Sequence, residues 1–259
     1  MTAPRFWYSW QRSALPWTMR GMDANDVETA RNFLSEWAEC VVRDRNHPSL
    51  LIWTPMNEEW WPDRVQFPRF VSDVYDLTKA LDPTRPVCDV SGGVHVKTDI
   101  WTTHNYEQDP KKLQDIVFNG QRWFQTPNYT LSFPQRNVGF NRHTDNNLYD
   151  FPTYLIDEVG GIKWVKGQDA QTGNDQNKSW GYGEPPHSLE EFYARLEGQI
   201  DALMEISENV WGYCYTQLTD VEQEQNGMYT YERKPKFKPE IYARITATNQ
   251  KPAAIEKKK

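Results

Sequence analysis

The stretch LLIWTPMNEEWW, residues 50–61, decides the expected fold class. Its first part is apolar, and it then changes abruptly to Asn57, Glu58 and Glu59, followed by two tryptophans. A short apolar run is typical of a buried strand. The polar residues after it stand where the carboxyl ends of parallel strands carry functional groups. This stretch therefore predicts a buried strand that ends at a functional site.

Amphipathic helices and further apolar runs alternate along the chain. Residues 26–44 place apolar side chains at three- and four-residue steps, which predicts a helix with one buried face. Ser188 and Glu191 form a capping box that predicts the start of another helix, extending to about residue 207. Further helices are expected at residues 70–81 and 110–118, and further strands at residues 86–93, 99–106, 153–161 and 210–220. This alternation predicts a parallel sheet covered by helices.

The strand ends favour one of the two parallel architectures. Nearly every expected strand ends in polar residues: Asn57-Glu58, His104-Asn105-Tyr106, Asp157-Glu158, and Gln217 with Asp220. A doubly wound sheet usually has a glycine-rich phosphate turn after its first strand, and we find none here. Several polar strand ends without that turn favour a (β/α)8 barrel, whose active site is built from such ends.

Glu58 and Glu158 each close an apolar strand, and the two strands are not sequential neighbours. A barrel would place their carboxyl groups across its mouth. Facing carboxyl groups are what cleavage of a glycosidic bond requires: one donates a proton and the other, ionised, attacks the sugar or activates water. Apolar neighbours such as Trp53 and Trp60 favour the protonated form of Glu58, which suits it to be the acid. The alternative is that both acids only cap the helices that follow their strands.

Several motifs resemble glycoside hydrolase family 2, the group of β-galactosidases, β-glucuronidases and β-mannosidases. RDRNHPSLLIWTPMNEEW, residues 43–60, is similar to its acid/base signature, and YLIDEVGG, residues 154–161, to its nucleophile strand. GYCYTQLTDVEQEQNGMYTYERKPKF, residues 212–237, resembles the region of strand eight in one bacterial branch. The resemblance implies that Glu58 is the general acid/base and Glu158 the nucleophile, with retention of configuration.

The resemblance also implies roles for neighbouring residues. Asn57 matches the asparagine that binds the sugar 2-hydroxyl beside the acid/base. The motif THNY, residues 103–106, implies that His104 and Asn105 contact the sugar, and that Tyr106 bonds to Glu158. For His104 a purely structural role remains open. Tryptophans that follow strand ends are candidates for stacking against a sugar or for loop packing: Trp60, Trp61, Trp164 and Trp180.

By this resemblance the chain contains barrel strands four to eight, whereas strands one to three and the family's β-sandwich domains are not recognisable. We therefore expect a partial TIM-barrel catalytic domain at residues 1–245 and a disordered tail at residues 246–259. Thr216 stands where many relatives have a tryptophan under the sugar, so the sugar and its linkage are not predicted.

The expected function is that of a retaining exo-β-glycosidase acting on terminal β-linked sugars. One alternative is a truncated, non-catalytic or carbohydrate-binding fragment of such an enzyme, because three strands are missing. Another is an endo-acting β-glycanase of the mannanase kind, which also carries Asn-Glu and Glu at strand ends.

Bulk properties limit the partners. The net charge of -7 argues against nucleic acid or an anionic membrane as the main partner. An oligosaccharide or glycoside is the partner that the paired acids and the resemblance imply. No apolar run reaches the length of a membrane span, and no signal peptide is recognisable. Because the true N-terminus may lie upstream, the localisation is not predicted. The 3 cysteines and the spacing of His and acidic residues indicate no metal and no cofactor. The oligomeric state is equally open.

Overall fold

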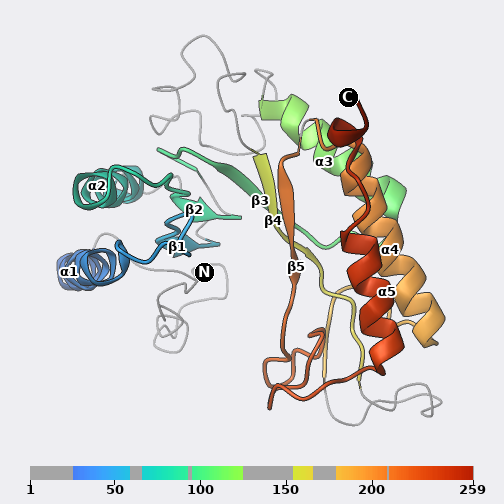
Figure 1. The fold of residues 1–259 in the computed structure, drawn as a ribbon. Coiled ribbons are helices and arrows are strands. Elements are labelled where there is room, and N and C mark those ends of the chain that lie inside the picture. Colours follow the sequence, from blue (N-terminus) through green and yellow to red (C-terminus); the bar gives the residue numbers. More distant parts are fainter. Residues whose placement is uncertain are drawn as a thin grey trace. The chain divides into compact units, whose positions relative to one another are not determined.

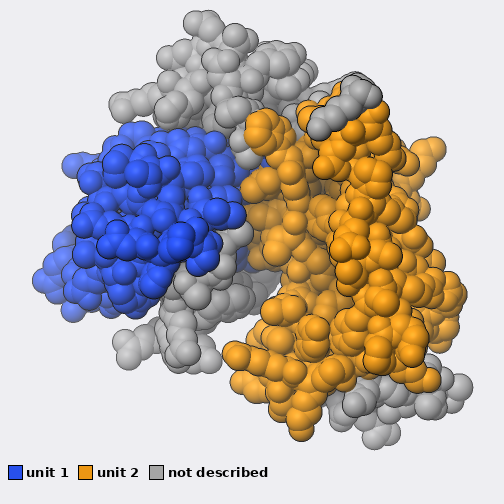
Figure 2. Space-filling model, in the orientation of Figure 1, with its two compact units in different colours: residues 1–103, 122–154 blue, residues 104–121, 155–259 orange. Residues whose placement is uncertain are grey.

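The computed structural model describes residues 26–58, 66–92, 95–124, 154–165, 179–208 and 210–258. The chain divides into two compact units, coloured separately in Figure 2. Unit 1 comprises Met1–Thr103 and Arg122–Tyr154, and unit 2 comprises His104–Gln121 and Leu155–Lys259. The elements, labelled in Figure 1, are α1 (Val27–Asp44), β1 (Met56–Asn57), α2 (Gln66–Leu81), β2 (Val90–Ser91), β3 (Trp101–Asn105), α3 (Pro110–Phe124), β4 (Tyr154–Gly160), α4 (Leu189–Glu205), β5 (Gly212–Thr216), α5 (Pro239–Asn249) and the 3-10 helix η8 (Ala254–Lys258).

Unit 1 is held by two helices that lie side by side, α1 and α2, and by a parallel pair of short strands, β1 and β2 (Figure 1). Two buried tryptophans meet edge to face in its core, with the ring centroids of Trp37 and Trp53 5.7 Å apart. Both indole N–H groups find acceptors, Trp37 at Thr78 (2.7 Å) and Trp53 at Asp82 (2.8 Å). Burial of these rings therefore leaves no indole donor without a partner.

The run of residues 50–53, predicted as the body of a strand, contributes only one bridge, between Trp53 and Val87. Backbone hydrogen bonds join Trp53 N to Pro86 O (3.1 Å) and Cys88 N to Trp53 O (2.9 Å). The ladder resumes only at β1, where Met56 pairs with Val90. Pro55 lies between the two pairings and has no N–H to donate, which explains the interruption.

Unit 2 is built on a sheet in the order β3-β4-β5, within which β4 and β5 are parallel. The unit boundary falls inside β3, so His104 and Asn105 belong to unit 2. Helix α4 begins as predicted, because the Ser188 hydroxyl accepts a hydrogen bond from Glu191 N at 3.1 Å. Helices α4 and α5 lie side by side (Figure 1). An apolar cluster forms the core beneath them: Ile162, Trp164, Phe192, Leu196, Ile200 and Phe237.

The prediction of a disordered tail from residue 246 was wrong for the described residues. Thr246 to Asn249 complete α5, and the hydroxyl of the buried Thr248 lies 2.7 Å from that of Tyr193. Lys251 then donates to Glu197 (2.6 Å) and Asp201 (2.9 Å) on α4, and η8 follows. Composition alone indicated a solvated tail, whereas partners supplied by α4 order it.

The alternation of helices with strands and the observed parallel pairings agree with the predicted α/β class. The described strands form two separate sheets, of two and three strands, and these do not close into a barrel. None of the helices in the described ranges is long and apolar enough to cross a membrane.

Candidate active site

The two acids of β4 lie at a β-bulge in its second half. Ile156 pairs with Tyr213 and Val159 with Tyr215, so three steps on β4 correspond to two on β5. In a regular strand, consecutive side chains point to opposite faces. The extra residue breaks this alternation between Ile156 and Val159, and bulges of this kind redirect side chains beside active sites. Asp157 and Glu158 lie inside the bulge.

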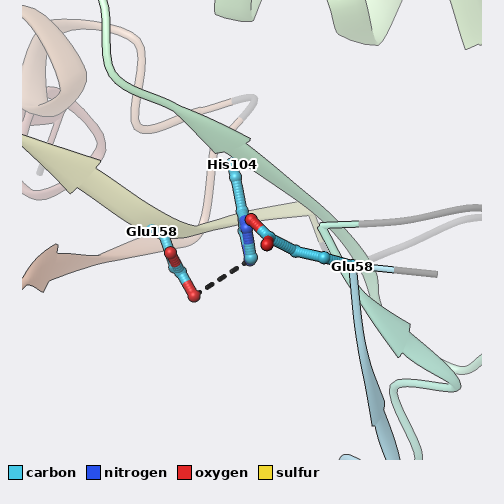
Figure 3. A group of neighbouring side chains, drawn as sticks. All are labelled: Glu58, His104 and Glu158. Atoms are coloured by element: carbon cyan, nitrogen blue, oxygen red, sulfur yellow. Dashed lines mark ion pairs between the residues drawn. The ribbon is translucent and has the colours of Figure 1, made fainter. Parts of the chain in front are cut away.

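His104, at the end of β3, meets both acids. Its Nε2 lies 3.5 Å from Asp157 Oδ1 and 3.5 Å from Glu158 Oε1, and its side chain is only 5% exposed. Figure 3 shows the imidazole and the Glu158 carboxylate, which come from neighbouring strands of the sheet. The bulge therefore lets one imidazole face two consecutive carboxylates. Glu58, the third residue drawn, belongs to unit 1.

Tyr106 donates a hydrogen bond from its hydroxyl to Glu158 Oε2, which is the contact that the motif resemblance implied. Burial, the hydrogen bond to Glu158 and the charge of that carboxylate raise the pKa of Tyr106, and a hydrogen bond with Thr216 opposes the shift in part. The phenol therefore stays neutral and remains a donor, and a donor to a carboxylate stabilises the ionised form of Glu158.

The Tyr106 ring is fixed by a close parallel stack on Tyr182, with centroids 3.5 Å apart and an interplanar angle of 2°. The stack depends on Gly161, at φ +62°: a Cβ there would lie 2.3 Å from Tyr182 Cδ2 and 3.1 Å from Tyr106 Cδ1. Gln108 adds two hydrogen bonds, from Nε2 to Tyr106 O (2.8 Å) and Gly160 O (2.7 Å). Gly160, the last residue of β4, and Gly161 thus allow two rings and an amide to pack against the turn.

β5 contributes Cys214 and Thr216 to the same surroundings. The pKa of the Cys214 thiol is raised by burial and by the charges of Asp157 and Glu158, so this thiol stays protonated beside the acids. Thr216 pairs with Gly160 in the β4–β5 ladder and hydrogen-bonds to Tyr106. Thr216 is thus linked to Glu158 through one phenol.

Trp180 lies on the segment that leads to α4, next to this aromatic stack. Its ring meets Tyr182 edge to face, with centroids 5.7 Å apart, and the residue is 46% exposed. Asn105 is engaged locally, because its Oδ1 accepts from Glu107 N at 2.9 Å and forms the turn after β3. Trp164 packs in the core against Phe192, which excludes it as a stacking wall.

The remaining predicted site residues belong to unit 1. Asn57 ends β1 and is exposed, and Glu58 follows it with φ 55°, a conformation that is uncommon for a residue other than glycine. Glu58 N donates to Ser91 O at 2.8 Å, which ties the turn to β2. Trp60 and Trp61 lie outside the described residues.

Sequence reasoning did not identify the roles of Tyr182, Gln108 or Glu224. The glycine pair after β4 was the available signal for the first two, because consecutive glycines after a strand suggest close packing by something large. Glu224 bridges to Trp180 through the backbone, a contact between segments more than forty residues apart for which the sequence carries no local signal.

Comparison with known proteins relates part of the chain to a family. Residues 10–133 match the model described as "Glycosyl hydrolases family 2, TIM barrel domain". A β-galactosidase of Photobacterium profundum is 30% identical over 172 residues, which are 61% of this chain and 16% of that protein. The chain thus spans about a sixth of this relative's length. The resemblance seen in the motifs is confirmed.

Solved structures share the fold. A β-D-glucuronidase from Dictyoglomus thermophilum matches with a TM-score of 0.58 and 17% identity, covering 92% of this chain and 39% of that one. A family 2 β-galacturonidase from Eisenbergiella tayi, bound to galacturonate, matches with a TM-score of 0.56 and 18% identity, covering 87% and 39%.

Proposed function

The chain is related to glycoside hydrolase family 2 through its TIM barrel domain, and on that premise we propose that it carries the catalytic part of a retaining exo-β-glycosidase. Its substrate is the terminal β-linked sugar of a glycoside or oligosaccharide. Glu158 is the proposed nucleophile and Glu58 the proposed acid/base.

The reaction proceeds in two displacements. In the first, Glu158 attacks the anomeric carbon, the glycosidic C–O bond breaks, and the proton of Glu58 passes to the departing oxygen. In the second, Glu58 takes a proton from water, the water oxygen bonds to the anomeric carbon, and the bond to Glu158 breaks. Retention requires the two carboxyl groups to face each other about 5 Å apart.

The surroundings of Glu158 are the observation that carries this proposal. A nucleophilic carboxylate must be ionised and held in one orientation. Tyr106 donates to one oxygen of Glu158 and His104 lies 3.5 Å from the other, so both oxygens are oriented from β3 and the turn after it. An ordinary helix-capping acid would instead accept hydrogen bonds from backbone N–H groups of the next helix. This arrangement supports nucleophilic chemistry over a capping role.

The remaining contacts are assigned within this scheme. Asn57 is proposed to bind the sugar 2-hydroxyl, where a bond that tightens in the transition state accelerates the reaction. His104 is proposed to contact sugar hydroxyls from its position beside Glu158. Trp60 and Trp180 are proposed to stack on sugar rings of the glycoside or oligosaccharide substrate.

Azide rescue tests the roles of the two glutamates. Glu158→Gly is expected to lose turnover of a 4-nitrophenyl β-glycoside, and azide is expected to restore it with the α-glycosyl azide as product. Azide is small enough to occupy the vacated space of the nucleophile, so the configuration inverts once. Glu58→Ala with the same substrate is expected to give the β-glycosyl azide, because Glu158 still forms the intermediate.

Glu190→Gln is the matched control, since Glu190 is an exposed carboxylate paired with Arg244 on α5. Its turnover is expected to match that of the unaltered chain. Full activity of Glu158→Gly without azide would show that Glu158 is not the nucleophile. Sugar binding without turnover by the unaltered chain supports a carbohydrate-binding fragment, and internal cleavage of β-mannan supports an endo-acting enzyme.

A further inference from the structure

Trp180 combines an exposed ring with a fixed backbone. The residue is 46% exposed, whereas its backbone N–H donates to Gln223 O (2.8 Å) and its backbone carbonyl accepts from Gln225 N (2.9 Å). These two bonds attach Trp180 to the segment after β5 as an isolated parallel bridge opposite Glu224. A large apolar face held in place at the surface provides a preformed platform, with little conformational entropy left to lose on binding.

The segment that holds Trp180 is itself rigid. Asp220 Oδ1 accepts from Lys236 Nζ (2.7 Å) and from Gly227 N (2.9 Å), and the Lys236 side chain is only 1% exposed. A Cβ on Gly227 would lie 2.2 Å from Asp220 N, so the two strands of this loop are in close contact. A buried ion pair and a close backbone approach together favour one loop conformation.

A short chain of amides orients the Glu224 carboxylate on that loop. Asn226 Nδ2 donates to Glu224 Oε1 at 3.0 Å, and Gln217 Nε2 donates to Asn226 Oδ1 at 2.9 Å. Asn226 is 1% exposed and Gln217 directly follows Thr216 at the end of β5. The carboxylate beside Trp180 is therefore positioned from the same strand end that supports Tyr106.

The position of this pair relative to Glu158 sets what it can bind. From Glu158 the contacts run to Tyr106, then to the stacked ring of Tyr182 at 3.5 Å, and then to Trp180 at 5.7 Å. Two aromatic rings thus lie between the indole and the nucleophile. In this series of contacts the indole is the ring furthest from the nucleophile, so it suits a second sugar of the substrate better than the sugar bonded to Glu158.

We propose that the Trp180 indole and the Glu224 carboxylate form a subsite for the sugar that leaves, next to the cleaved bond. The indole stacks on the apolar face of a pyranose ring, and the carboxylate accepts hydrogen bonds from its hydroxyl groups. The inference rests on the proposed exo-glycosidase function. An exo-acting enzyme binds the terminal sugar at its nucleophile, so any second sugar of the substrate belongs to the leaving group. It makes a β-linked disaccharide, rather than a simple glycoside, the preferred substrate.

The test compares leaving groups with and without a second sugar, in the full chain. The substrates are lactose, cellobiose and β-mannobiose, each paired with the β-glycosyl fluoride of its terminal sugar, whose leaving group is a single atom. Trp180→Ala and Glu224→Ala are each expected to lower kcat/KM for the cleaved disaccharide about 10-fold, with the corresponding fluoride changed less than about twofold. Trp180→Phe is expected to restore most of the loss, because it keeps an aromatic face.

Trp211→Ala is the matched control. Trp211 is 65% exposed and precedes β5, at the end of the strand opposite to Gln217. Its removal is expected to change kcat/KM for neither the disaccharide nor the fluoride. Equal losses on disaccharide and fluoride, or no loss on either, overturn the subsite.

Calorimetric titration of the same disaccharides into Glu158→Gln, with and without Trp180→Ala, separates the two proposals. If the unaltered chain hydrolyses none of the substrates, the exo-glycosidase function is refuted. The subsite is still supported in that case if Trp180→Ala weakens disaccharide binding about 10-fold. Absent binding, or binding that Trp180→Ala leaves unchanged, overturns the subsite by itself.

Discussion

Removing one hydroxyl, in Tyr106→Phe, isolates what the phenol does for Glu158. The ring stays, so the stack on Tyr182 with centroids 3.5 Å apart is kept, whereas the donor to Glu158 Oε2 and the hydrogen bond with Thr216 are lost. A hydrogen bond to a charged group contributes about 1.5–3 kcal/mol. At about 1.36 kcal/mol per pH unit, its loss corresponds to a displacement of about 1–2 units in the titration of the carboxylate.

The direction of the expected pH shift depends on which form of Glu158 the hydrogen bond stabilises. The pKa of Tyr106 is raised by burial and by Glu158, so the phenol is protonated over the whole working range and always favours the ionised carboxylate. Without that donor, Glu158 binds its proton more tightly and the active, ionised form is lost at higher pH. The acid limb of kcat/KM is therefore expected to move upward by about 1–2 pH units, with a loss of about 10–100-fold on the acid side.

The measurement is kcat/KM against pH from 4 to 9 with a 4-nitrophenyl β-glycoside, since this parameter reports ionisations of the free enzyme. Tyr213→Phe is the matched control: Tyr213 lies on β5, and its hydroxyl donates instead to Asn249 Oδ1 at 2.5 Å. Its acid limb is expected to stay in place. An unchanged acid limb in Tyr106→Phe would show that this phenol does not support the ionised nucleophile.

Three further substitutions test the scaffold by urea unfolding. Gly161→Ala is expected to cost about 1–3 kcal/mol, because the residue has φ +62° and its Cβ would lie 2.3 Å from Tyr182; an equal cost in Gly212→Ala would count against the stack as the cause. Asp220→Ala is expected to cost about 3–5 kcal/mol by leaving Lys236 buried without its partner, and Lys236→Met in the same chain should recover most of it. Burial raises the pKa of Asp82, but hydrogen bonds from Thr84, Trp53 and Arg85 outweigh this effect and hold the pKa well below its usual value. The ionised carboxylate therefore contributes to the free energy of unfolding above about pH 4, and this contribution is lost as the pH falls below that. Asp82→Asn is accordingly expected to destabilise unit 1 by about 1–3 kcal/mol at pH 7, and a difference from the unaltered chain that does not shrink toward pH 3 would contradict this.

The sequence was most informative where structure depends on neighbours along the chain. Apolar spacing predicted α1 and α4, and the Ser188 cap of α4 is made by a residue three positions from its partner. Strand positions were predicted less well, because a ladder needs a partner strand: the run before Pro55 contributes a single bridge, and the paired strand starts only at Met56. The tail beyond residue 246 was mispredicted for the same reason, since Lys251 is held by acids some fifty residues earlier.

The class of fold, the family relationship and the acids at strand ends could all be predicted from the chain alone, because these properties reside in local patterns and in motifs. How Glu158 is held became visible only in three dimensions. One extra residue between Ile156 and Val159 cancels the alternation of side chains, so that Asp157 and Glu158 both meet His104 at 3.5 Å. A bulge is defined by the register against the neighbouring strand, and register depends on packing across the sheet rather than on residues that adjoin in the chain.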